Sequence, residues 1–100
     1  MSFFSNLFGG GGRNPQIEAA LAAGHPVVDV RSPAEFAQGH IEGALNVPLD
    51  TLPNRVAELK ALGKPLVLCC ASGMRSGQAQ GFLQANGIEC INAGGWQNLR

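Results

Sequence analysis

The chain has few charged residues, no long apolar run and few cysteines. Charged residues make up 14% of its 100 residues and the formal net charge is zero. No basic run occurs, so nothing supports nucleic-acid binding or an electrostatic hold on a membrane. No apolar stretch approaches the length of a transmembrane segment. With 45% hydrophobic residues, the composition is that of a globular protein, and its length suits one stable domain.

The three cysteines, Cys69, Cys70 and Cys90, fit no zinc-binding pattern. A single bridge from Cys90 to Cys69 or to Cys70 stays open as an alternative to free thiols. Free thiols suit a reducing compartment, which predicts a cytoplasmic protein. Residues 1–8 lack an early positive charge, a long apolar core and a convincing cleavage site, so they make a poor signal peptide. A periplasmic protein whose leader had been removed would look the same.

The first thirteen residues differ in composition from the rest of the chain. An apolar patch is followed by four glycines at positions 9–12, which is typical of a flexible linker. The patch consists of Phe3, Phe4, Leu7 and Phe8. We expect residues 1–13 to form a flexible segment and residues 14–100 to form the folded domain. Docking of the patch on the domain, a membrane or a partner is the alternative.

Helical and strand patterns alternate from residue 14 onward. Asn14-Pro15 is typical of a helix start, and this helix is expected to end at Gly24. Residues 32–35 (SPAE) have the pattern of a capping box, which predicts a second helix that ends near Gly39. Further helices are expected at about 53–63, 76–86 and from Trp96, with strands at 27–30, 44–47, 66–69 and 88–91. This alternation predicts an α/β fold, an open parallel sheet with helices on both faces. Active loops of such sheets gather at the carboxyl ends of the strands.

The segment from Cys70 to Arg75 links a buried strand to a helix. Its small residues let backbone N–H groups turn inward to form an anion-binding nest, and the helix N-terminus adds its own N–H groups. A cysteine at the rim of such a nest has a lowered pKa, and its thiolate is a nucleophile. We therefore predict that Cys70 is the catalytic residue and that its sulfur is open to the anion pocket. The predicted substrate-binding residues are Ala71, Ser72, Gly73, Met74 and Arg75.

Three blocks of the sequence resemble the single-domain rhodaneses, which are sulfurtransferases. The blocks are residues 28–48 (beginning VDVRSPAEF), 70–79 (CASGMRSGQA) and 94–96 (GGW). The resemblance covers most of the chain and implies a rhodanese-like α/β fold with the active loop between a central strand and a helix. It implies that Cys70 takes a sulfane sulfur from thiosulfate or another small anionic donor and passes it to cyanide or a thiol. No metal or cofactor is expected, and a thioredoxin-like reductant is a further candidate partner.

Several other residues receive supporting roles. The Asp29–Arg31 pair matches the Asp-x-Arg of rhodaneses, and the resemblance implies that it holds the active loop and the adjoining turn. Glu35 either pairs with Arg31 or only caps its helix. His40 is expected to be structural and His25 to have no role. Cys69 and Cys90 are expected to fill the core, and Trp96 to anchor the terminal helix.

Two other functions remain as alternatives. Phosphatases and arsenate reductases of the same fold use a longer loop, with five residues between cysteine and arginine. The spacing from Cys70 is four residues, whereas from Cys69 it would be five. We favour Cys70 because it ends the strand, and because the loop has no acid to protonate a phosphate leaving group. The second alternative is a non-catalytic rhodanese-like module that binds a partner.

Overall fold

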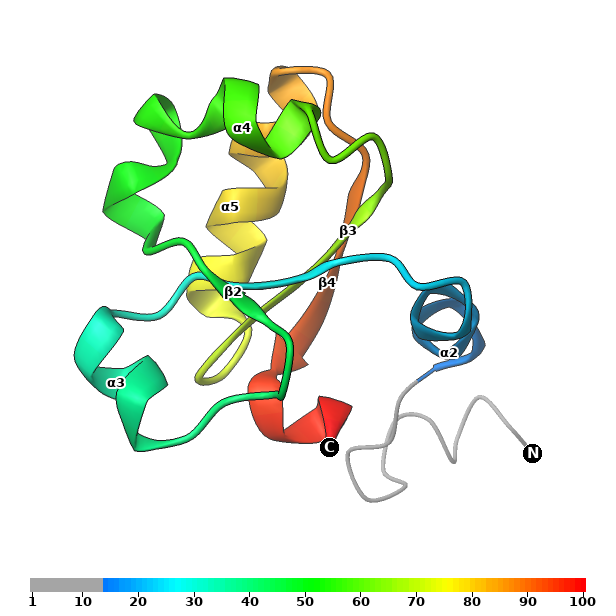
Figure 1. Cartoon of the computed structure of the whole chain (residues 1–100), viewed down its shortest axis with the longest axis vertical. Helices are drawn as coiled ribbons and strands as arrows, with labels where there is room; N and C mark the ends of the chain where they lie inside the picture. The colour runs from blue at the N-terminus through cyan, green and yellow to red at the C-terminus, as the bar shows by residue number, and fades with distance from the viewer. Residues whose placement is uncertain (1–13) are drawn as a thin grey trace.

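In the computed structural model of the chain, residues 14–100 are described, and the predictions for residues 1–13 lie outside them. Within these residues, four strands form one parallel sheet in the order β2-β1-β3-β4 (Figure 1). They are β1 (Val27–Asp29), β2 (Leu45–Asn46), β3 (Leu66–Cys70) and β4 (Cys90–Gly95). The predicted open parallel sheet is confirmed. No helix within the described range is long and apolar enough to cross a membrane.

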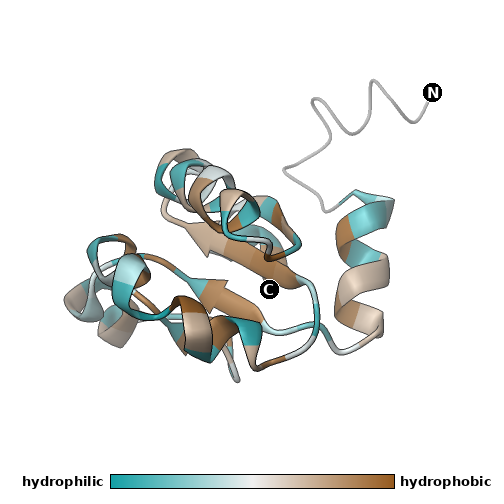
Figure 2. Ribbon diagram, turned by 90° about the horizontal axis from the view of Figure 1, so that it is seen from above, coloured by the Kyte–Doolittle hydropathy of each residue, from teal (hydrophilic) through white to brown (hydrophobic). Residues whose placement is uncertain are grey.

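The pleat of β3 separates two hydrophobic cores, because alternate side chains of a strand point to opposite faces. Leu66, Leu68 and Cys70 belong to one core and Val67 and Cys69 to the other. The first core is covered by the 3-10 helix η1 (Leu49–Asn54), α4 (Val56–Lys60) and α5 (Met74–Ala85), and the second by α2 (Pro15–Ala22) and the 3-10 helix η2 (Trp96–Leu99). Figure 2 shows the apolar strands between these layers.

Two helix starts follow their sequence signals. Asn14 caps α2, because its side-chain oxygen accepts a hydrogen bond of 2.8 Å from the N–H of Ile17. At the start of α3 (Pro33–Gln38), the N–H of Glu35 donates to the Ser32 hydroxyl and the N–H of Ser32 donates to the Glu35 carboxylate. Both bonds of the predicted capping box are therefore present.

Most boundaries shift by one or two residues from the sequence prediction, and three elements show differences with a clear physical cause. The region 53–63 is not one helix: η1 begins at Leu49, contains Pro53, and is followed by the short α4. Proline lacks an N–H and limits helix continuation around it. The helix after the active loop begins at Met74, two residues early, because Gly73 takes the left-handed conformation (φ +102°) that ends the loop. The last strand begins at Cys90, since the N–H of Ile88 still bonds back to Leu83 at the end of α5.

A β-bulge in β4 lies beside the active loop. Leu68 pairs with Asn92, but Cys70, two residues further on β3, pairs with Gly95, three residues further on β4. The extra residue on β4 bends the strand locally and re-aims its side chains. The bulge therefore places the segment from Asn92 to Gly95 against the loop that follows Cys70.

Candidate active site

The candidate site lies at the carboxyl end of β3, where the chain turns into α5 (Figure 1). Cys70 is the last residue of β3, and residues 71–73 make the turn before the first residue of the helix, Met74. A Cβ on Gly73 would lie 3.3 Å from the Cα of Gly94, and one on Gly95 would lie 2.9 Å from the carbonyl oxygen of Ala71. The glycines of β4 thus allow the loop to approach the strand closely.

The sulfur of Cys70 is held by hydrogen bonds at the base of this loop. The N–H of Gly73 donates to it at 3.0 Å and the N–H of Ser76 at 3.4 Å, and the Ser76 hydroxyl lies 3.3 Å away. Burial acts to raise the pKa of Cys70, but the Ser76 hydroxyl and the N–H groups of Ser76, Gly73 and Ser72 outweigh it and lower that pKa below the ordinary 9.0. The predicted thiolate-stabilising nest is thus present.

The expected exposure of the sulfur is not found. Cys70 is 1% exposed, packed with the core on the α5 face of the sheet. The expectation of a sulfur open to the pocket is therefore wrong, because the thiol itself occupies the nest that was assigned to a substrate anion. Its cover is a single turn of chain in which Ala71 and Ser72 are exposed. A substrate reaches this sulfur only when that turn or the Cys70 side chain moves.

Ser76 and Asn92 complete the surroundings of Cys70, and neither was predicted. The Ser76 hydroxyl, on a residue with no exposed surface, donates to the side-chain oxygen of Asn92 at 2.6 Å. The side-chain N–H of Asn92 in turn donates to the carbonyl oxygen of Gly73 at 3.0 Å. The place of Ser76 in the first turn of the helix could have signalled its role. Asn92 gave no such signal, since its position depends on the bulge in β4.

Arg75 does not stand alone at the mouth of the loop. Its guanidinium forms a bidentate ion pair with the Glu35 carboxylate, with N–O distances of 2.7 and 3.0 Å. The hydrogen bond from Arg75, together with the N-cap contacts of Ser32, lowers the pKa of Glu35 to about 2. The carboxylate of Glu35 thus caps its helix and pairs with Arg75, whereas the suggested side-chain pairing with Arg31 is not formed. Substrate binding by Arg75 stays a prediction.

Asp29 and Arg31 form a buried ion pair at the end of β1. Their closest N–O distance is 2.7 Å, and both side chains are at most 5% exposed. Arg31 also donates to the carbonyl oxygen of Gly39 at 2.7 Å and lies over the Trp96 ring, 4.7 Å from its centroid. The pair therefore ties β1 to the turn after α3 and to the terminal 3-10 helix. A role in orienting the active loop stays a prediction.

The other two thiols differ from Cys70 in that their pKa values are raised. All three cysteines are free and buried, so the alternative of a bridge to Cys90 is not realised. Burial and the neighbouring Asp29 raise the pKa of Cys69 to about 12, and burial raises that of Cys90. The Nδ1–H of His40 donates a hydrogen bond of 2.7 Å to the carbonyl oxygen of Phe36, and the imidazole stacks on the Phe36 ring. This agrees with a structural role for His40.

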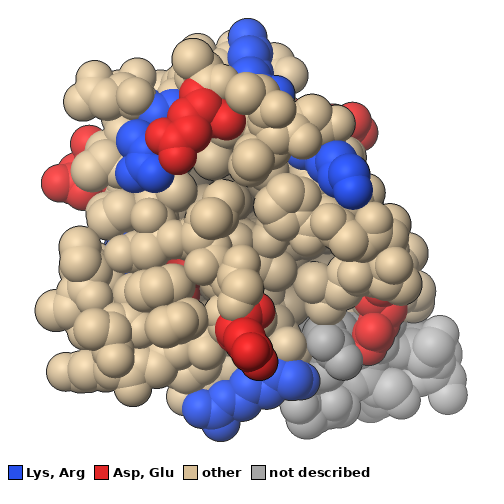
Figure 3. All heavy atoms as spheres, in the orientation of Figure 1, with Lys and Arg blue, Asp and Glu red and all other residues tan. Residues whose placement is uncertain are grey.

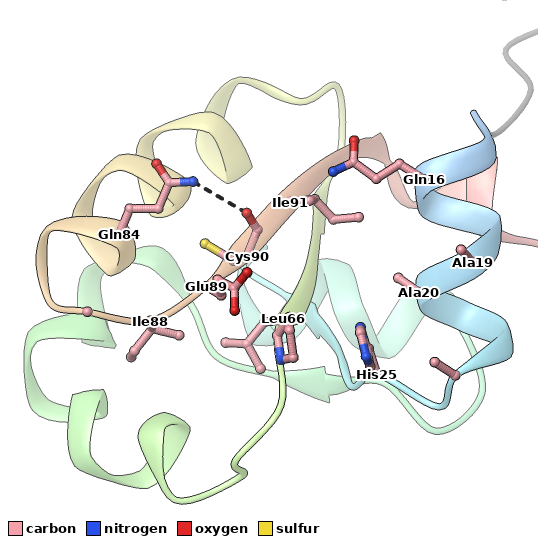
Figure 4. A pocket seen from close by; sticks show the side chains of 13 residues that line it. Gln16, Ala19, Ala20, His25, Leu66, Gln84, Ile88, Glu89, Cys90 and Ile91 are labelled. Carbon is pink, nitrogen blue, oxygen red and sulfur yellow. Dashed lines mark hydrogen bonds between the residues drawn. The ribbon is translucent and has the colours of Figure 1, made fainter.

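Hollows lie at both ends of the sheet in the described part of the chain. One of about 680 Å³ lies at the amino ends of β3 and β4, between α2 and α5, where the side chain of Gln84 donates to the backbone of Cys90 (Figure 4). The other, about 380 Å³, lies beside the active loop and is lined by Arg75, Asp50 and Ser32 together with four apolar residues. Charged side chains of both signs are scattered over the face shown in Figure 3.

The chain thus has an open parallel sheet of the α/β class, with a cysteine that accepts backbone N–H hydrogen bonds between a strand and a helix N-terminus. The family model "Rhodanese-like domain" matches residues 14–100, so the chain belongs to the rhodanese-like domain family. This confirms the resemblance seen in the sequence blocks.

Named relatives extend this placement. The chain is 46% identical over 61 residues to an uncharacterized protein of Bacillus subtilis (61% of this chain, 48% of the relative) and 43% identical over 61 residues to a sulfurtransferase of Allochromatium vinosum (61% and 56%). It spans about half the length of these curated relatives. The structure of a human single-domain sulfurtransferase is similar, with a TM-score of 0.66 and 32% identity over 85% of this chain and 89% of that one.

Proposed function

We propose that this chain is a sulfurtransferase that carries a sulfane sulfur on Cys70 as a persulfide. The observation that carries the proposal is the Cys70 sulfur itself, which has a lowered pKa and accepts N–H hydrogen bonds from Gly73 and Ser76. A thiolate is the nucleophilic form of cysteine, and the same N–H groups stabilise negative charge that returns to the sulfur. The two relatives named as sulfurtransferases support this choice.

In the first half of the proposed reaction, the Cys70 thiolate attacks the outer sulfur of thiosulfate or a similar donor. The new S–S bond forms as the donor's S–S bond breaks, and sulfite leaves with the electron pair of the broken bond. In the second half, cyanide or a thiolate attacks the outer sulfur of the persulfide. The Cys70 thiolate is then the leaving group, and thiocyanate or a new persulfide is the product. The two steps balance without an external oxidant.

The remaining groups of the loop are proposed to bind the donor. Once the turn over Cys70 opens, residues 71–75 present N–H groups and the Arg75 guanidinium to the oxyanion. The alternative of a phosphatase or arsenate reductase, with Cys69 as the nucleophile, has less support. The Cys69 thiol has a pKa of about 12 and lies on the α2 face of the sheet. Three free thiols fit the proposed cytoplasmic location.

Mass spectrometry of the intact protein after incubation with thiosulfate tests the proposal. We expect a gain of one sulfur atom that a reducing thiol removes. Cys70→Ser should abolish the gain and the transfer to cyanide, whereas Cys69→Ser is the matched control and should keep both. If Cys69→Ser abolishes the gain and Cys70→Ser does not, the nucleophile is assigned wrongly. If no donor loads the folded protein, the chain is a binding module.

A further inference from the structure

The hydroxyl group of Ser76 lies between two atoms that compete for its single hydrogen. Its oxygen is 2.6 Å from the side-chain oxygen of Asn92 and 3.3 Å from the sulfur of Cys70. Ser76 has no exposed surface, so its hydrogen goes to one of these protein atoms. A hydroxyl has one hydrogen to donate and two lone pairs to accept with, and it rotates to suit its neighbours.

The orientation of Asn92 is set by two other hydrogen bonds. The backbone N–H of Gly94 donates to its side-chain oxygen at 2.9 Å, and its side-chain nitrogen donates to the carbonyl oxygen of Gly73 at 3.0 Å. The atom that faces Ser76 is therefore the oxygen, which has no hydrogen of its own. At 2.6 Å the hydrogen between these two residues must come from Ser76. The serine oxygen then offers only lone pairs to Cys70.

This arrangement fits a neutral Cys70, whose S–H donates to the serine oxygen. Ionisation reverses the requirement, because a thiolate is an acceptor without a hydrogen. Two acceptors would then face each other at 3.3 Å unless the Ser76 hydroxyl turns toward the sulfur. A hydrogen bond to an ionised partner is about twice as strong as one between neutral groups, so the thiolate outcompetes the amide oxygen for the hydrogen.

We propose that Ser76 is a positioning residue whose hydroxyl hydrogen passes from Asn92 to the Cys70 sulfur whenever that sulfur carries negative charge, and returns to Asn92 when the sulfur is neutral. No covalent bond to hydrogen breaks in this exchange. The proton of the thiol leaves to solvent or buffer when Cys70 ionises, and only the direction of the serine O–H bond changes.

The place of this exchange in catalysis rests on the proposed function. The sulfur of Cys70 is a thiolate before it attacks the donor, uncharged while it is the inner sulfur of the persulfide, and a thiolate again when it leaves. Ser76 thus stabilises the sulfur before the first step and after the second. Asn92 keeps the hydroxyl satisfied in between, when an unpaired buried hydroxyl would be costly.

The pH dependence of Cys70 alkylation by iodoacetamide, followed by peptide mass spectrometry, tests the exchange without any sulfur donor. Ser76→Ala should raise the Cys70 pKa by about one to two units, since it removes a hydrogen bond to a charged group. Ser76→Thr, which keeps a hydroxyl, should restore a pKa close to that of the wild type. Asn92→Ala should shift the pKa downward, because the hydroxyl no longer has a competing acceptor.

The opposite signs of the two shifts separate the exchange from simple loosening of the loop. Loosening would raise the pKa in both variants, and that result would overturn the proposal, as would a Ser76→Ala profile superimposable on the wild type. In the double variant, Asn92→Ala should no longer lower the pKa, since the hydroxyl is gone. If the shifts appear but no donor loads Cys70, the sulfurtransferase proposal fails and the hydroxyl exchange stands.

Discussion

Gly73 is the residue of the active loop whose replacement has the most specific consequence. It adopts φ +102°, a conformation that L side chains rarely take, and its N–H makes the shortest hydrogen bond to the Cys70 sulfur, at 3.0 Å. A Cβ at this position would also lie 3.3 Å from the backbone of Gly94. In Gly73→Ala the loop must therefore move away from β4, and the N–H must move away from the sulfur.

The size of the effect follows from these two contacts. A side chain in a left-handed conformation costs about 1–2 kcal/mol, and the contact with Gly94 brings the expected loss of stability to the upper end of that range. For a domain of this length, a loss of about 2 kcal/mol lowers the melting temperature by roughly 8–16 °C. Loss of one hydrogen bond to a charged group, about 1.5 kcal/mol, lowers the thiolate fraction at neutral pH about tenfold.

Gly43→Ala is the matched control. Gly43 also has a positive φ, +85°, but a Cβ there would meet nothing within 4 Å, so we expect a loss of stability of about 1 kcal/mol and unchanged thiol chemistry. Urea unfolding measures the first effect, and the midpoint of the pH dependence of Cys70 alkylation by iodoacetamide measures the second, because the midpoint reports ionisation and not access to the sulfur. The reasoning is refuted if Gly73→Ala is destabilised but keeps the wild-type midpoint, because the Gly73 N–H would then not control the ionisation of the sulfur.

Three further predictions concern charge. Asp29→Asn should lower the free energy of unfolding by about 3–5 kcal/mol in urea titrations, since it leaves a buried arginine without its carboxylate; a loss below 1 kcal/mol would contradict this account. Because the pKa of Glu35 is lowered in the folded protein, the Glu35 carboxylate stabilises the fold fully above pH 4.5, its ordinary pKa. That stabilisation is lost as the pH falls toward about 2. An NMR titration of the Glu35 carboxyl group with a midpoint near 4.5 would show that Arg75 does not pair with it in solution. In the folded protein, the pH dependence of Cys70 alkylation should have its midpoint below pH 9.0. Cys69 should stay unlabelled, because its pKa is about 12. Labelling of Cys69 before Cys70 would reverse the assignment of the nucleophile.

Features that depend on residues close in sequence could be predicted. The cap of Asn14 and the capping box of Ser32 and Glu35 are formed within three residues of each side chain, and alternation along β3 correctly separated Cys69 from the face of Cys70. The open parallel sheet followed from the order of strands and helices. These features need no knowledge of what packs against them.

Features that depend on distant contacts could not be predicted. Glu35 and Arg75 are 40 positions apart, and no local pattern says that their helices bring the two side chains together. Asn92 reaches the loop only because of a bulge in β4. The burial of Cys70 also escaped prediction, since the way its own loop folds over the sulfur depends on close approach to Gly94 and Gly95.

The contact between the end of β4 and the loop has a consequence for the order of folding. Asn92 holds the Gly73 carbonyl, and Gly95 lies against Ala71, so the nest around Cys70 is complete only when the last strand has joined the sheet. Until then the thiol keeps the pKa of a cysteine in an unfolded chain and is mostly protonated at neutral pH. The lowered pKa of Cys70 is therefore a property of the completed sheet, and it appears only once β4 has paired with β3.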